Sequence, residues 1–173
     1  MDEMTFNKKE IDLLRAAYQA FVGKTHTFEV YKSPDWENTG IENWVQTEFT
    51  VALVDRDYSV TTEGKVKRGC DLIVKNDKLH LDVGIEIRAY TCVYPEGLID
   101  GIEKHPKADL YLFLSQFDNE SLSQLNAYFK KNGYIENHRT FSGWMVMLVK
   151  KEHKIERKNR QTWKRMTKTK TVE

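Results

Sequence analysis

Residues 79–90 alternate between apolar and mainly polar side chains, and this alternation constrains the fold more than any other feature of the chain. Successive side chains on a β-strand point to opposite faces, so the pattern predicts a strand with one face on a core and one polar face. Glu86 and Arg88 lie on the polar face and point the same way, about 7 Å apart along the strand. The apolar face holds Leu79, Leu81, Val83, Ile85, Ile87 and Ala89, and the other face holds His80, Asp82, Gly84, Glu86, Arg88 and Tyr90.

Residues 108–114 are apolar almost throughout, which is typical of a strand covered by helices on both faces. Asn7 and Glu10 have the spacing of a capping box and predict the start of a helix. The chain therefore reads as one α/β domain over 1–150, a mixed central sheet flanked by helices, followed by a tail over 151–173. We expect helices at 11–21, 41–53, 95–104 and 122–129, and strands at 25–31, 58–62, 70–74, 79–90, 108–114 and 144–149.

The charge of the chain is divided unevenly, although the formal total over its 173 residues is only +1. Residues 150–173 hold ten basic and three acidic residues, a charge of +7, which leaves 17 basic and 23 acidic residues, −6, in 1–149. Such a tail favours contact with nucleic acid ahead of a membrane surface; the competing interpretation is a solvated tail that binds nothing. The basic residues expected to contact nucleic acid are Lys65, Lys67, Arg68, Arg157, Lys158, Arg160, Lys164 and Arg165.

Composition also bears on the compartment. The two cysteines, Cys70 and Cys92, do not form a disulfide framework, and no apolar run approaches the length of a membrane-spanning helix. The first residues lack the order of a secretory signal. We therefore expect a cytoplasmic protein that is not inserted in a membrane.

Four charged residues interrupt apolar patterns. Glu48 falls on the apolar stripe of the helix expected at 41–53, Asp71 opens a strand of aliphatic residues, and Glu86 and Arg88 share one strand face. Each has a structural explanation: a helix-edge glutamate paired with a lysine or arginine, an aspartate capping a neighbouring amide, and a surface ion pair. Taken together, three converging carboxylates would repel one another, and a hard divalent cation such as Mg²⁺ or Mn²⁺ would be their natural occupant.

These residues, with the element order over 41–114, resemble the PD-(D/E)XK nuclease superfamily, the fold of many restriction endonucleases and Holliday-junction resolvases. Glu48 would stand in the leading helix, Asp71 would be the motif aspartate, and Glu86 and Arg88 would form its (D/E)-x-K element. The resemblance implies a restriction endonuclease-like αβββαβ core preceded by an extra N-terminal helix. It also implies that Asp71 and Glu86 bind the metal and that Glu48 is an auxiliary ligand.

The chain departs from the family motif at two positions. Cys70 stands in place of the proline, and Arg88 stands in place of the lysine that helps to position or activate water. Arginine stays protonated and cannot act as a base, but it can bind a phosphate or stabilise charge in a transition state. Two functions follow: a metal-dependent nuclease acting on DNA, as a homodimer or within a larger assembly, or a catalytically inactive domain of the same fold that binds nucleic acid or protein.

The length of the loop between the two strands at 70–74 and 79–90 decides whether the acids can meet. A two-residue turn at Asn76 and Asp77 would place Asp71 opposite Asp82. A wider loop over 77–80 would place Asp71 opposite Glu86 instead. The shared-metal hypothesis requires the wider loop.

Overall fold

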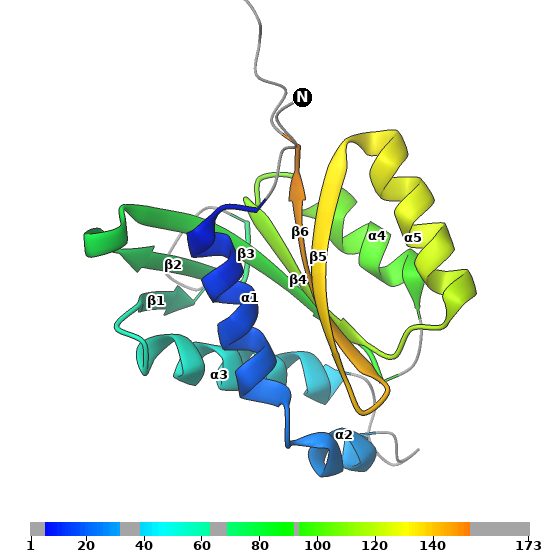
Figure 1. Ribbon diagram of the computed structural model, residues 1–173, viewed down its shortest axis with the longest axis horizontal. Helices are drawn as coiled ribbons and strands as arrows, with labels where there is room; N and C mark the ends of the chain where they lie inside the picture. Colours follow the sequence, from blue (N-terminus) through cyan, green and yellow to red (C-terminus); the bar gives the residue numbers. More distant parts are fainter. Residues whose placement is uncertain (1–5, 32–38, 63–68, 92–93, 153–173) are drawn as a thin grey trace, which may run out of the picture.

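A computed structural model describes residues 6–31, 39–62, 69–91 and 94–152, and it contains one mixed sheet in the order β1-β2-β3-β4-β6-β5 (Figure 1). Neighbouring strands are antiparallel except for β3 and β4, which are parallel and are joined through helix α4. The strands are β1 (Ser59–Thr62), β2 (Leu72–Asn76), β3 (Leu81–Ala89), β4 (Leu110–Ser115), β5 (Tyr134–Phe141) and β6 (Trp144–Lys151). The helices are α1 (Lys8–Phe21), α2 (Thr25–Tyr31), α3 (Thr39–Val54), α4 (Pro95–Lys104) and α5 (Asn119–Asn132).

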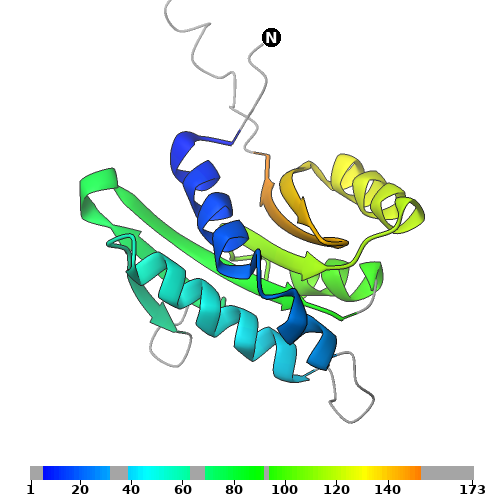
Figure 2. The same cartoon turned by 60° about the horizontal axis from the view of Figure 1, so that its bottom comes forward.

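The sheet is the middle of three layers, and each of its faces has its own apolar core. Helices α1, α2 and α3 cover one face, and α4 and α5 cover the other (Figure 2). On β3, the odd-numbered Ile85, Ile87 and Ala89 belong to the first core. Strand β4 contributes to both cores, as its uninterrupted apolar sequence predicts. The α/β class with a mixed sheet flanked by helices is therefore confirmed.

Several sequence patterns appear in the structure almost as expected. The capping box forms at the start of α1, where Asn7 Oδ1 accepts from the Glu10 amide at 3.0 Å and Glu10 Oε2 accepts from the Asn7 amide at 2.8 Å. The α4 bounds coincide with the expected range 95–104. From α3 onward the order is α3-β1-β2-β3-α4-β4, with α1 and α2 preceding it. This order matches the expected sequence of one helix, three strands, a helix and a strand.

Two expectations about secondary structure are wrong. Residues 25–31 form helix α2 and not a strand, because Phe28 packs between Trp44 and Trp144, at 5.1 and 4.3 Å between ring centroids. Burial of this ring outweighs the strand preference of the β-branched and aromatic residues around it. Strand β5, absent from the expectations, is an edge strand with a mostly half-exposed and polar sequence. It lacks the alternation that identifies a half-buried strand.

The loop between β2 and β3 is the wider one. A 3₁₀ turn at Asp77–Leu79 (η2) follows β2, with Asn76 Oδ1 accepting from the Leu79 amide at 3.1 Å. His80 closes the turn in the left-handed region, at φ 49°. As a result Asn76 pairs with Leu81 and Leu72 with Ile85. Within the described residues, no helix combines the length and apolarity needed to cross a membrane.

Candidate functional site

The register of β2 on β3 brings Asp71 level with Glu86. Leu72 pairs with Ile85, so continuing the ladder by one residue places Asp71 opposite Glu86. The Asp71 carboxylate turns to the edge of β3, where its Oδ2 accepts a hydrogen bond from the Ile87 amide at 2.7 Å. Strand β2 begins only at Leu72 and offers the Ile87 amide no backbone acceptor. The Asp71 carboxylate supplies that acceptor instead.

Glu86 is the buried centre of a polar cluster on the α4 side of the sheet. Its side chain is only 1% exposed, and a buried carboxylate requires charged or hydrogen-bonding partners. Arg88 Nη2 lies 2.8 Å from Glu86 Oε1, and His105 Nδ1 lies 3.3 Å from Glu86 Oε2. Glu86 and Arg88, both expected on the polar face of β3, thus form an ion pair.

Glu42, at the start of α3, is the second carboxylate bound by Arg88. Its Oε1 lies 3.0 Å from Arg88 Nη1, and it also receives a hydrogen bond from the Ala89 amide. Burial raises the pKa of Glu42, and repulsion from Asp71 adds to the rise, whereas Arg88 and the Ala89 amide oppose it. The amides of Ile87 and Ala89 face away from β4, on the stretch of β3 that β2 does not pair. The first is bound by the Asp71 carboxylate and the second by the Glu42 carboxylate.

Arg88 lies among three carboxylates and remains a cation. Burial alone would lower the pKa of the guanidinium, but attraction to Glu86, Glu42 and Asp71 outweighs it and the pKa is raised. The stem of Arg88 lies against Gly101 of α4, where an added Cβ would lie 2.8 Å from Arg88 Cγ. Helix α4 therefore approaches the cluster closely only because residue 101 has no side chain.

His105, at the C-terminal end of α4, completes the cluster. Its Nε2 lies 3.1 Å from Arg88 Nη2, and its Nδ1 lies 3.0 Å from the Gly69 carbonyl oxygen. A guanidinium can only donate, so in this arrangement Nε2 is the acceptor and Nδ1 is the donor to the Gly69 carbonyl oxygen. Tyr111, paired with Glu86 across β3 and β4, donates to the His105 carbonyl at 3.0 Å.

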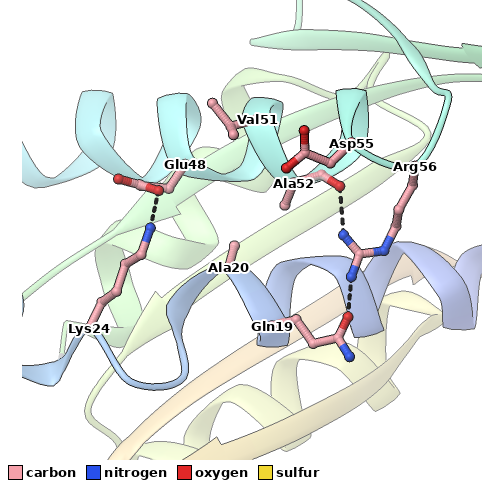
Figure 3. Close-up of a pocket in the computed structure, with 8 residues that line it drawn as sticks. All are labelled: Gln19, Ala20, Lys24, Glu48, Val51, Ala52, Asp55 and Arg56. Atoms are coloured by element: carbon pink, nitrogen blue, oxygen red, sulfur yellow. Dashed lines mark hydrogen bonds and ion pairs between the residues drawn. The ribbon is translucent and has the colours of Figure 1, made fainter.

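Glu48 is not brought to this cluster. Glu48 comes six positions after Glu42, which places the two side chains about 120° apart around the helix. Its carboxylate forms an ion pair with Lys24, in a surface pocket between α1 and α3 (Figure 3). In the same pocket Arg56 donates to the Ala52 carbonyl oxygen and to the Gln19 side chain. Glu48 is therefore a helix-edge glutamate paired with a lysine.

The basic residues expected to contact nucleic acid lie outside the described residues. This applies to the group that precedes β2 and to the C-terminal tail, namely Lys65, Lys67, Arg68, Arg157, Lys158, Arg160, Lys164 and Arg165.

The carboxylate cluster suits a hard divalent cation in its chemistry but not in its present spacing. Glu42, Asp71 and Glu86 are oxygen donors, and three carboxylates against one guanidinium leave a formal excess of two negative charges. In the described part of the chain, however, no three His, Cys, Asp or Glu side chains are close enough together to hold one metal ion. The guanidinium of Arg88 lies between these acids, so a cation could be shared only after Arg88 had moved away from Glu86.

Comparisons of the chain with protein-family models, with curated proteins and with solved structures found no match.

Sequence reasoning missed Glu42 and His105. The only local signal for Glu42 is its spacing from Gln46, one helical turn away, since both side chains then lie on the same side of the helix. In the structure the Gln46 side chain donates to the Asp71 carbonyl oxygen at 3.4 Å. No local pattern marks His105, since only the path of α4 across the sheet brings it to Gly69 and Arg88.

Proposed function

We propose that this protein is a metal-dependent phosphodiesterase of the nuclease-like class, acting on nucleic acid at the cluster of Glu42, Asp71, Glu86 and Arg88. The observation that carries the proposal is the register of the β2–β3 hairpin. It brings the aspartate just before β2 level with a glutamate of β3, and an arginine lies two residues further along the same face of β3. The restriction endonuclease-like core and the preference for DNA belong to the same proposal.

In this proposal Asp71 and Glu86 would hold Mg²⁺ or Mn²⁺ once Arg88 had moved away from Glu86, and Glu42 would take the auxiliary role that the sequence resemblance assigns to Glu48. The cation would supply Lewis-acid chemistry, which polarises a phosphate and lowers the pKa of a bound water. Arg88 donates to a non-bridging oxygen of the phosphate and stabilises the negative charge that develops there. It does not accept a proton, because its pKa is raised above an already high value.

A direct test is nicking of supercoiled plasmid by the full chain with Mg²⁺ or Mn²⁺, and with chelator as the blank. Asp71→Asn and Glu86→Gln are better variants than alanine, because Asn keeps an oxygen acceptor for the Ile87 amide. We expect metal-dependent nicking that falls at least about 100-fold in both variants, the scale of losing a group that acts in the transition state.

Glu42→Gln and Glu48→Gln form a matched pair, since they remove the same charge from the same helix on different sides. We expect the first to reduce nicking and the second to leave it unchanged. The reverse result would return the auxiliary role to Glu48. A folded wild-type protein that shows no metal-dependent nicking would refute the hydrolase.

A second candidate, a catalytically inactive domain of the same class that binds nucleic acid or protein, is favoured by one observation. Arg88 forms ion pairs with both Glu42 and Glu86, which satisfies the cluster without a metal. This candidate predicts salt-sensitive binding to nucleic acid that Asp71→Asn leaves unchanged, with no cleavage at any metal concentration.

A further inference from the structure

The most exposed aromatic side chain among the described residues lies beside the polar cluster. Tyr94, the N-cap residue of α4, is 49% exposed, whereas every other Phe, Tyr or Trp in those residues is buried or half-buried. A tyrosine that leaves half of its surface in water forgoes much of the stabilisation that its burial would provide. Its position is therefore a candidate for binding.

Tyr94 is connected to Arg88 through Tyr90. Tyr90 continues the even-numbered face of β3 by one step beyond Arg88, and its amide donates to the Leu114 carbonyl oxygen at 3.0 Å, which extends the ladder with β4. The rings of Tyr90 and Tyr94 meet edge to face with 5.3 Å between centroids. Side-chain exposure increases outward along this row, from 1% at Glu86 and 17% at Arg88 to the exposed ring of Tyr94.

Glycines in α4 make room for this row. An added Cβ at Gly97 would lie 2.4 Å from Tyr94 Cδ1 and 2.7 Å from the Tyr90 hydroxyl oxygen, and Gly101 stands in the same relation to Arg88. Both tyrosines therefore pack one side against the first turn of α4, while about half of Tyr94 stays exposed. The ring of Tyr94 is held in place before any ligand arrives, which reduces the entropy that a ligand must overcome.

We propose that Tyr94 is a stacking platform for an unpaired nucleobase, next to the phosphate that Arg88 contacts. The proposal rests on the proposed function and deepens it, because it names the substrate as nucleic acid that offers a single-stranded or splayed-out nucleotide at the site. Tyrosine stacking accepts any base, since every base has a π-face, so this contact selects an unpaired nucleotide and not a sequence. The acidic formal charge of residues 1–149 weakens attraction to phosphates, whereas stacking on a base does not depend on that attraction.

The test uses the full chain and a single-stranded oligonucleotide that carries one 2-aminopurine, in chelator and in Ca²⁺, so that binding is read without cleavage. Stacking on an aromatic ring quenches 2-aminopurine fluorescence. We expect quenching and binding with the wild type and with Tyr94→Phe. With Tyr94→Leu, which keeps apolar bulk but has no ring, we expect loss of the quenching and affinity about 5- to 150-fold weaker.

Two controls test whether the loss of binding comes from the Tyr94 ring itself. One is a surface substitution far from Tyr94, and the other removes the base from the oligonucleotide. Val54→Ala removes an exposed apolar side chain, 55% exposed, at the far end of α3, and should leave binding unchanged. Replacing the 2-aminopurine nucleotide by an abasic one should weaken binding to the wild type by the same factor as Tyr94→Leu, and should have no effect on binding to Tyr94→Leu itself.

Equal binding by wild type and Tyr94→Leu would overturn the stacking role. It would not bear on the hydrolase proposal, which the plasmid assay tests separately. Quenching without any plasmid nicking would support the stacking role and refute the hydrolase alone. A wild-type protein that binds neither oligonucleotide nor duplex would overturn both proposals. Tighter binding to duplex than to single strand would overturn the preference for an unpaired base.

Discussion

Replacing Arg88 by methionine tests whether the guanidinium is what makes the burial of Glu86 tolerable. Methionine keeps an unbranched stem but removes the charge 2.8 Å from Glu86 Oε1. Removing one partner of a buried ion pair costs about 3–5 kcal/mol, because the other charge is left without compensation. The pair with Glu42, whose side chain is 33% exposed, adds at most about 1 kcal/mol. We therefore expect Arg88→Met to lower the free energy of unfolding by about 3–5 kcal/mol.

The single variant Glu86→Leu and the double variant Arg88→Met, Glu86→Leu complete a double-mutant cycle. The cycle separates the energy of the ion pair from the packing of the two side chains. Replacing a buried ion pair by apolar side chains is often neutral or stabilising, so the double variant should be more stable than Arg88→Met alone. The coupling energy between the two sites should be about 2 kcal/mol or more, within the range found for residues in contact.

Urea unfolding, followed by the fluorescence of buried Trp144 and half-buried Trp44, measures these differences. With a slope of about 2 kcal/mol per molar urea, a loss of 3–5 kcal/mol lowers the midpoint by about 1.5–2.5 M. A double variant whose loss of stability equals the sum of the two single losses, to within about 0.5 kcal/mol, would refute the reasoning.

Three further predictions concern the same fold. Burial raises the pKa of Glu42 above 4.5, so the native state binds this proton more tightly than the unfolded state does, and the contribution of Glu42 to stability falls as pH rises above 4.5. Urea unfolding at several pH values should show that Glu42→Gln removes this contribution to the pH dependence of the free energy of unfolding. Phe28→Ala should cost about 3–5 kcal/mol by thermal or urea unfolding, because the ring stacks fully buried on Trp144. Mn²⁺ should raise the Tm of Arg88→Met more than that of the wild type in calorimetry, since the guanidinium no longer competes for the acids; an equal shift would contradict this competition.

The strand pattern of the sequence correctly predicted that Glu86 and Arg88 lie on one face of β3. Strict alternation in β3 is enough to place Glu86 and Arg88 on one face, because the two-residue period of a strand does not depend on its partners. The length of the loop after β2 was left open by the sequence. It is determined by Asn76, whose side chain caps η2, and by His80, which adopts a left-handed conformation.

The glutamate of α3 shows where pattern reasoning fails. The fully buried stripe of this helix is Ile41, Val45, Phe49 and Leu53, and both of its flanks are half-buried, because α3 packs on the sheet and on α1. Glu42 lies on the flank beside β3 and Glu48 on the flank beside α1. Helical periodicity identifies the stripe, but it contains no information on which flank faces which neighbour.

The polar cluster joins residues that are far apart along the chain, from Glu42 to His105, and this separation has a consequence for folding. Its contacts span α3, the start of β2, β3 and the end of α4, and β3 gains its parallel partner only after the chain has crossed through α4. Closing the long stretches of chain between these residues costs entropy before the contacts of the cluster can offset it. We therefore expect the cluster to form late on the folding pathway. The charged groups around Arg88 would then stay hydrated until the sheet has assembled, and a chain in which α4 had not yet packed on the sheet would lack the contacts of His105 with Arg88 and Glu86.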